Sequence, residues 1–212
     1  MKIDFKEISQ EIKNGDLSGF KNLVDAFKDK AFSLCMKILK DKGESEDALQ
    51  DSFIKLYYSM QTGKFEGKSS LSTYFYSIVY NTAIEYYRKY RSKNFNIISF
   101  EVNESSFREG DELTRNLNIV TSRKNESPST ETDVLQKEVG NIINEYINSL
   151  PEHYSVILTM FYINELSINE ITEILKIPSG TIKNRIFRAR EKLKEILLMN
   201  FKKEELLEYV LN

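Results

Sequence analysis

The stretch SINEITEILKIPSGTIKNRIFRAREKL, residues 167–193, decides the fold of the C-terminal part of this chain. Its first four residues have the Ser-x-x-Glu spacing of a capping box and predict a short helix that ends near Leu175. The tripeptide Pro-Ser-Gly at 178–180 breaks that helix. A longer helix, capped by Ser179, is expected to run from there to about Leu198. Two helices joined by so short a turn are typical of a helix-turn-helix.

The longer helix is expected to have one buried face and one basic face. At about 100° per residue, four apolar side chains fall within an arc of about 60°; they are Ile182, Ile186, Ala189 and Leu193. The interval 176–194 holds seven basic residues and one acidic residue, a local charge of +6. A solvated basic helix would share this charge. The capped first helix and the proline-containing turn favour DNA binding, in which Arg, Lys, Asn and Phe contact base edges.

Helical periodicity also extends through the N-terminal part, where apolar residues recur every three or four positions. One stripe contains Phe20, Leu23, Val24, Phe27, Ala31, Leu34 and Ile38, and the next contains Leu49, Phe53, Leu56 and Met60. Ser45 is the expected N-cap of the second helix. A glycine-bounded loop, 62–69, then leads to a third helix over about 70–92. No alternating pattern is long enough for a convincing strand, so the fold class is expected to be all-α.

Two surfaces of the N-terminal part carry functional residue types. Acidic and amide side chains gather near the start of the second helix: Glu44, Glu46, Asp47, Gln50 and Asp51. Taken alone, these acids are more simply explained by compensation of the helix dipole. The third helix carries seven aromatic residues, Tyr74, Phe75, Tyr76, Tyr80, Tyr86, Tyr87 and Tyr90, and ends in the basic run 88–93. Interleaved aromatic and basic residues hold unstacked bases, although Phe75, Ile78 and Val79 are expected in the core.

The segment 94–132 lacks periodicity, is rich in Ser, Asn, Glu and Thr, and contains Pro128. A structureless stretch of that length is uncommon inside one compact domain, so it predicts a flexible linker between two small helical domains. Helical pattern resumes near Val134, and Pro151 is expected to be the first residue of a helix. The expected divisions are a first domain at 1–93, a linker at 94–133, a second domain at 134–199 and a C-terminal extension at 200–212.

Composition excludes several classes of site. One cysteine and one histidine among 212 residues rule out a disulfide framework, a multi-cysteine metal site and a histidine-rich metal site. Cys35 is expected to be a buried, unreactive thiol. The sequence has no phosphate loop, no signal peptide and no apolar run long enough to span a membrane. We therefore expect a cytoplasmic protein that is not an enzyme and needs no cofactor or metal.

Several motifs resemble the sigma-70 family of bacterial RNA polymerase specificity subunits, in its extracytoplasmic-function (ECF) group. EDALQDSF at 46–53 is similar to the acidic helix of the family's second conserved region. LPEHY at 150–154, LSINEI at 166–171 and GTIKNRIFRAREKL at 180–193 are together similar to the fourth region. The resemblance covers about 150 residues and implies a sigma region 2 domain followed by a sigma region 4 domain.

The resemblance also implies partners and residues. The partners are core RNA polymerase (its largest and second-largest subunits), promoter DNA and an anti-sigma factor. Residues expected at the −35 element are Thr181, Lys183, Asn184, Arg185, Phe187 and Arg188. Residues expected at the −10 element, where the DNA is melted, are Phe65, Lys68, Ser69, Ser70, Tyr74, Asn81, Glu85, Arg88 and Arg91. Residues expected to face core polymerase are Asp47, Gln50, Asp51 and Phe53.

Two departures and two alternatives accompany this interpretation. Tyr74 stands where the family usually has Trp, and Glu85 where it usually has Asp. A stand-alone helix-turn-helix regulator would bind DNA as a dimer, without polymerase, and would not need the acidic helix or the tyrosine cluster. A nuclease is less favoured because the acids show no recognisable metal-ligand spacing. The net charge of −2 combines +3 over 1–93, −3 over 94–137 and −2 over 138–212, as expected for a protein with two kinds of partner.

Overall fold

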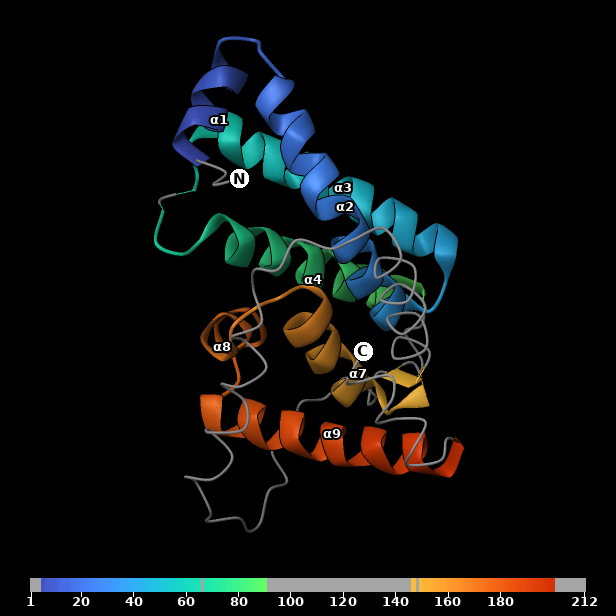
Figure 1. The fold of residues 1–212 in the computed structure, drawn as a ribbon. Helices are drawn as coiled ribbons and strands as arrows, with labels where there is room; N and C mark the ends of the chain where they lie inside the picture. Colours follow the sequence, from blue (N-terminus) through green and yellow to red (C-terminus); the bar gives the residue numbers. More distant parts are fainter. Residues whose placement is uncertain (1–4, 66, 91–145, 148, 201–212) are drawn as a thin grey trace, which may run out of the picture.

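The computed structural model describes residues 5–65, 67–90, 146–147 and 149–200, and every regular element within those ranges is a helix (Figure 1). The all-α expectation is therefore confirmed. The elements are α1 (Phe5–Lys13), α2 (Ser18–Leu39), α3 (Lys42–Thr62), α4 (Leu71–Tyr90), α7 (Glu152–Leu158), the π-helix η2 (Thr159–Ile163), α8 (Ile168–Leu175) and α9 (Ser179–Asn200). The expected linker at 94–133 and all but the first residue of the C-terminal extension lie outside the described residues.

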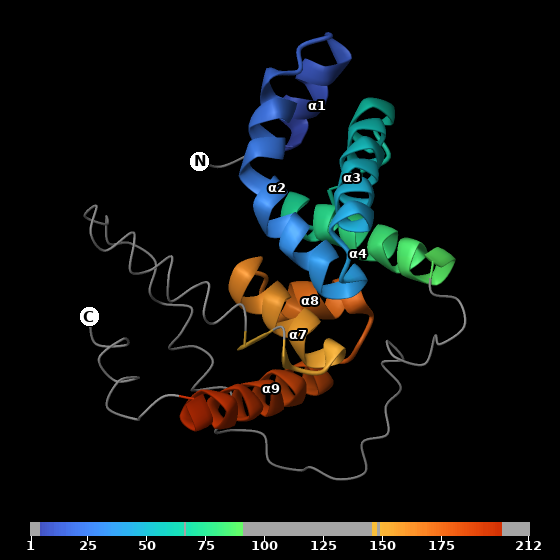
Figure 2. The same ribbon diagram turned by 90° about the vertical axis from the view of Figure 1, so that its right-hand side faces the viewer.

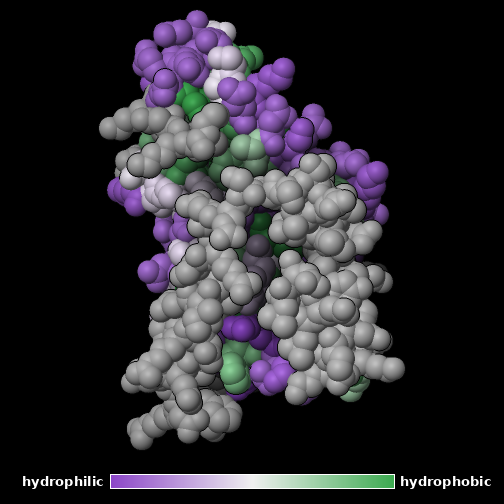
Figure 3. Space-filling model, viewed as in Figure 1, coloured by the Kyte–Doolittle hydropathy of each residue, from purple (hydrophilic) through white to green (hydrophobic). Residues whose placement is uncertain are grey.

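Helices α1–α4 form an N-terminal group in which α2, α3 and α4 pack against one another (Figures 1 and 2). Leu34 from α2, Leu56 from α3 and Phe75 from α4 meet in its core and are fully buried. The outer surface around α1 is mainly hydrophilic in the view of Figure 3, as expected of amphipathic helices that turn their apolar stripes inward. The apolar periodicity did not single out α1, which packs on α2 and α3.

Helix α3 begins earlier than the sequence indicated. Asp41, in an extended conformation, is its N-cap, and the Asp41 carboxylate accepts a hydrogen bond from the backbone N–H of Glu44. The expected cap, Ser45, is fully buried inside the helix and donates its hydroxyl to the carbonyl of Asp41. The prediction of Ser45 as the cap is wrong because Asp41 is an equally good cap one turn earlier and Lys42 and Gly43 continue helically.

Helices α7–α9 and η2 form a C-terminal group that contains the helix-turn-helix. The Ser167 hydroxyl and the Glu170 carboxylate complete the predicted capping box at the start of α8. Lys176 ends α8 in a left-handed conformation (φ 58°), which turns the chain toward α9. Three of the four predicted seam residues of α9 are fully buried, while Leu193 is half-buried. Ser179 is the first residue of α9 rather than its cap, and Pro151 is the N-cap of α7 rather than its first residue.

The two groups lie in direct contact, which the sequence did not predict. Helix α8 packs against α4, and α7 and η2 pack against α2 (Figure 2). The buried Asn164 side chain donates a 2.6 Å hydrogen bond to the backbone carbonyl of Lys30 in α2. Two ion pairs flank this contact, Lys30 to Glu165 at 3.1 Å and Lys40 to Glu152 at 2.6 Å. The first group and the second are thus held together through both apolar and polar contacts.

Candidate nucleic-acid and protein interfaces

The outer face of α9 presents some of the predicted −35 residues to solvent and buries others. Phe187, 47% exposed, and Arg188 are exposed. Lys183 and Asn184 are half-buried. Thr181 and Arg185 are buried. An exposed phenyl ring next to an exposed guanidinium is the combination that contacts thymine methyls and guanine in a major groove.

Arg185 is buried near residues of both groups. Burial raises the pKa of Tyr80 in α4 to about 12, and the positive charges of Arg88 and Arg185 oppose that rise. Burial also lowers the pKa of His153 in α7, and Arg185 adds to that effect. Arg185 therefore lies close to both α4 and α7, and its side chain is directed toward protein in this arrangement.

The loop between α3 and α4, residues 63–70, is shaped by two glycines with positive φ, Gly63 at 69° and Gly67 at 71°. The Phe65 ring packs against Tyr74, with centroids 4.5 Å apart. The hydroxyl of Tyr74 shares a 2.6 Å hydrogen bond with Ser59 of α3. Phe65 and Tyr74 together form an aromatic wall beside the loop, which has the chemistry of a platform for an unstacked base.

The α8 capping box reaches across to the end of this loop. Glu170 Oε1 accepts hydrogen bonds from Ser70 at 2.9 Å and from Thr73 at 2.7 Å. Burial would raise the pKa of Glu170, but the hydrogen bonds from Ser167, Thr73 and Ser70 outweigh it and hold that pKa below its usual value. The Glu170 carboxylate thus takes part in the capping box of α8 and also accepts a hydrogen bond from Ser70, a predicted −10 residue.

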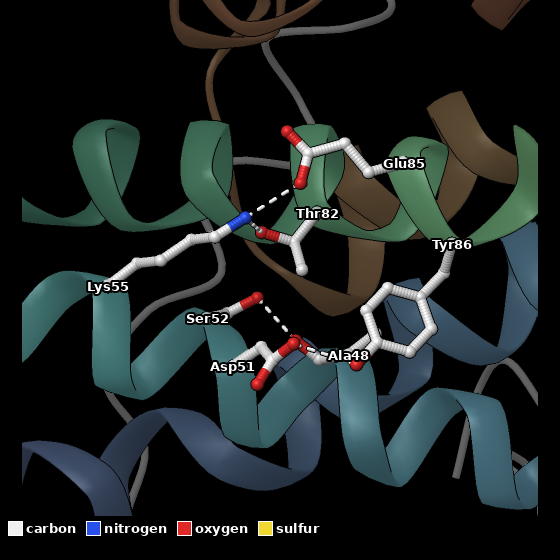
Figure 4. Close-up of polar contacts among 7 residues, drawn as sticks. All are labelled: Ala48, Asp51, Ser52, Lys55, Thr82, Glu85 and Tyr86. Carbon is white, nitrogen blue, oxygen red and sulfur yellow. Dashed lines mark hydrogen bonds and ion pairs between the residues drawn. The ribbon is translucent and has the colours of Figure 1, made fainter. Parts of the chain in front are cut away.

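The exposed face of α4 carries three predicted −10 residues, Asn81, Glu85 and Arg88, at the spacing of one helix face. Glu85 forms a 2.8 Å ion pair with Lys55 of α3 (Figure 4). Of the remaining predicted −10 residues, Lys68 is exposed and Ser69 is half-buried. Arg91 lies outside the described residues.

Much of the tyrosine cluster of α4 belongs to the core. Tyr76 and Tyr87 are 1% and 3% exposed, so these two members of the cluster fill the core. Tyr80 and Tyr86 are half-buried, and Tyr90 is 53% exposed. Phe75 and Val79 are fully buried, as predicted. The spacing of aromatic residues alone did not separate the two roles because α4 has neighbours on most of its circumference.

The acidic side chains of α3 occupy two environments. Asp47 and Gln50 are exposed. Asp51 is half-buried and accepts a 2.7 Å hydrogen bond from the hydroxyl of Tyr86 (Figure 4). That bond is the main reason why the pKa of Tyr86 is raised to about 12. Phe53 is half-buried and stacks on Phe75, with ring centroids 4.8 Å apart.

An apolar groove of about 590 Å³ lies between α2 and α3 beside these acids. Phe53 and Gln50, both predicted from the sequence, line it. Two further lining residues, Ile54 and Tyr58, are 45% and 58% exposed and escaped prediction. Ile54 and Tyr58 are four residues apart and so lie on one face of α3 with Gln50, a spacing that could have identified them.

Two kinds of site were not found among the described residues. No group of three His, Cys, Asp or Glu side chains there could hold a metal ion. No helix in that part of the chain has the length and apolar character needed to cross a membrane.

Two family models match the sequence. Sigma-70 region 2 matches residues 23–93, which include α3, the following loop and α4. Sigma-70, region 4, matches residues 140–193, which include the helix-turn-helix.

Curated relatives match over nearly the whole chain. The ECF RNA polymerase sigma factor SigW of Bacillus subtilis (strain 168) is 33% identical over 197 residues, covering 93% of this chain and 98% of that protein. The ECF RNA polymerase sigma-E factor of Escherichia coli (strain K12) is 31% identical over 186 residues, covering 86% of this chain and 88% of that protein.

Solved structures share the fold at low sequence identity. CnrH in complex with the cytosolic domain of CnrY has a TM-score of 0.57 and 15% identity, and the match covers 93% of this chain and all of that one. The sigma factor RpoE in complex with the anti-sigma factor NepR from Bartonella quintana has a TM-score of 0.53 and 18% identity, covering 86% and 98%.

Proposed function

The chain belongs to the sigma-70 family of RNA polymerase sigma factors, in its ECF group, and on that premise we propose how it divides its task between its two helical groups. The C-terminal group reads the −35 element, the N-terminal group binds and opens the −10 element, and α3 binds core polymerase. The observation that supports this division most directly is the α9 face on which Phe187 and Arg188 are exposed in a helix-turn-helix.

At the −35 element, α9 enters the major groove. Arg188 donates to guanine, Asn184 pairs with adenine and Phe187 contacts a thymine methyl group; each good pair discriminates by about 1–3 kcal/mol. Lys183 and the basic residues toward the C-terminal end of α9 neutralise phosphates and set the register. Arg185 and Thr181 are buried in this structure, so they join this surface only after their surroundings rearrange.

At the −10 element, the loop 63–70 captures an unstacked base. The aromatic wall of Phe65 and Tyr74 supplies the stacking surface, and Lys68 and Ser69 lie beside it in the loop. Capture of a base offsets a few kcal/mol of unstacking and so favours melting. The exposed row Asn81, Glu85 and Arg88 lies along the adjoining DNA.

Core polymerase binds at the groove between α2 and α3. Exposed apolar side chains in the groove bury area on association. The carboxylates of Glu46, which lines the groove, and of the exposed Asp47 attract basic residues of the partner. The chain works in the cytoplasm, where polymerase and DNA are found, and carries out no covalent step of its own. An anti-sigma factor is a further partner, as in the RpoE–NepR complex.

Reconstitution tests this proposal. Purified chain is mixed with sigma-free core polymerase, and a random-sequence DNA pool is selected for duplexes that support initiation. The proposal requires core binding and specific start sites that depend on the chain. A chain that binds DNA alone as a dimer and ignores core polymerase would instead support a helix-turn-helix regulator.

A pair of variants tests the −35 assignment. Arg188→Ala is expected to weaken promoter binding by the holoenzyme by about 5- to 150-fold, equivalent to about 1–3 kcal/mol. Lys13→Ala, at an exposed position of α1 that the proposal does not place on DNA, is the matched control and is expected to change affinity far less. Full-strength transcription by Arg188→Ala would contradict the assignment.

A further inference from the structure

A polar seam joins α3 to α4 on the side that faces the proposed −10 DNA (Figure 4). Lys55 extends from α3 and donates to two acceptors of α4: Glu85 Oε2 at 2.8 Å and Thr82 Oγ1 at 3.0 Å. One turn earlier on α3, Asp51 accepts the hydroxyl of Tyr86. Thr82 is buried, so its hydroxyl is a fixed anchor for the Lys55 ammonium group.

Glu85 poses an electrostatic problem for the proposed function. It is exposed, in one row with Asn81 and Arg88, on the face of α4 assigned to DNA. A bare carboxylate there would repel phosphates. A unit charge about 8 Å from a phosphate, at an effective dielectric constant of about 20 to 40, alters binding by roughly 5- to 30-fold before salt screening.

Lys55 removes this repulsion because its positive charge lies next to the Glu85 carboxylate. Its ammonium group lies 2.8 Å from the Glu85 carboxylate, and the Lys55 side chain is 46% exposed, so the pair meets solvent at the same surface. A lysine has three donors, and the hydrogen bonds to Glu85 and Thr82 use two of them. The third can reach a phosphate oxygen.

We propose that Lys55 is a positioning residue of the −10 surface: it orients Glu85, cancels its charge and so allows the DNA backbone to approach α4. This inference rests on the proposed function. It differs from a plain surface ion pair, which would contribute only about 0–1 kcal/mol to stability and nothing to DNA binding.

A double-mutant cycle on the reconstituted holoenzyme tests the inference. The probe is a duplex selected from a random pool by the wild-type holoenzyme. Lys55→Met, which keeps the aliphatic stem, is expected to weaken binding of that duplex about fivefold and to change the slope of log affinity against log salt concentration. In the Lys55→Met background, Glu85→Gln is expected to restore at least half of the loss on a logarithmic scale, because no uncompensated carboxylate remains. Glu85→Gln alone is expected to tighten binding about twofold.

Lys42→Met is the matched control, because Lys42 also forms an exposed ion pair from α3, with Glu46 at 3.7 Å. It is expected to leave both duplex affinity and salt slope within error of the wild type. Core binding by Lys55→Met is measured in parallel and is expected to match the wild type.

Each other outcome overturns the inference. Unchanged duplex affinity and salt slope in Lys55→Met would show that the Lys55–Glu85 ion pair has no role in DNA binding. An equal loss in the single and double variants would show that Lys55 acts independently of Glu85. Loss of core binding in Lys55→Met would show that Lys55 belongs to the surface that binds polymerase. Failure of the wild-type chain to direct initiation would instead overturn the proposed function itself.

Discussion

The ammonium group of Lys37 lies inside the protein, where the residue is only 5% exposed. Burial lowers the pKa of Lys37 to about 8. Between about pH 8 and the usual lysine pKa of 10.5, the unfolded chain therefore binds more protons at this site than the folded protein. The contribution of Lys37 to the free energy of unfolding must therefore rise with pH across that window.

Lys37→Met tests this linkage. The free energy of unfolding of the wild type, measured by urea denaturation, is expected to rise relative to that of Lys37→Met from about pH 8 to 10.5. Comparison with the variant cancels the opposing effect of the buried tyrosines. Lys42→Met, at an exposed position, should show no such relative change. Parallel pH curves for the wild type and Lys37→Met would contradict the prediction.

Cys35 provides a second prediction at the scale of one residue. It is fully buried, and burial raises the pKa of its thiol to about 12, so little reactive thiolate is present near neutral pH. The native chain should resist alkylation by iodoacetamide and react readily once unfolded in urea, as followed by mass spectrometry. Ser179→Cys, at an exposed position, supplies the reactive control. Rapid labelling of native Cys35 would disprove the prediction.

At the scale of the element, the end of α3 depends on Gly63. This residue caps the helix with φ 69°, and its backbone N–H donates to the carbonyls of Met60 and Ser59. An added Cβ would meet nothing within 4 Å, so the cost of a side chain there is conformational rather than steric. Gly63→Ala is expected to lower the free energy of unfolding by about 1 kcal/mol.

Gly43→Ala is the matched substitution at the other end of the same helix. Gly43 does not adopt a left-handed conformation. A Cβ added at Gly43 would lie 3.5 Å from its nearest neighbour, the Asp41 carboxylate, which is an ordinary van der Waals distance. Alanine there is expected to stabilise the protein by about 0.5 kcal/mol, because it restricts the unfolded chain. Urea denaturation of the two variants should therefore give opposite signs; the same sign for both would contradict this account of the α3 boundaries.

Most elements could be predicted because their signals are local. The capping box of α8, its end at Leu175 and the buried seam Ile182, Ile186 and Ala189 all appear as predicted. The errors also have local reasons. Asp41 and Ser45 are both good N-caps, and the sequence did not say which would be used. The tyrosines of α4 were harder, since burial of Tyr76 depends on neighbours from other helices.

At the scale of the whole molecule, the proposed −35 and −10 surfaces belong to two helical groups that pack against each other. By their numbering, the −35 and −10 positions differ by about 25 base pairs, or about 85 Å of duplex at about 3.4 Å per base pair. In this structure α8 packs directly on α4, and Glu170 binds Ser70 and Thr73. The two groups are therefore expected to separate when the chain binds polymerase and promoter.

Fluorescence energy transfer measures this separation. Dyes are attached at Gln61→Cys in α3 and Glu195→Cys in α9, both exposed positions, while buried Cys35 stays unlabelled. Transfer is expected to be high in the free chain and to fall in the complex with core polymerase and promoter. Dyes at Lys13→Cys and Gln61→Cys, within the N-terminal group, should show no change. Equal transfer by the first pair in both states would contradict the expected opening.

The sequence by itself determined most of the helices, the helix-turn-helix, the acidic helix and the family resemblance, because periodicity, caps and motifs involve residues a few positions apart. Only the tertiary structure decided which tyrosines are buried, that Ile54 and Tyr58 open a groove with Phe53, and that Lys55 pairs with Glu85. It also decided that Glu170 joins two segments about 100 residues apart along the chain. Such contacts depend on how whole helix faces meet in space, and no local pattern in the sequence encodes that geometry.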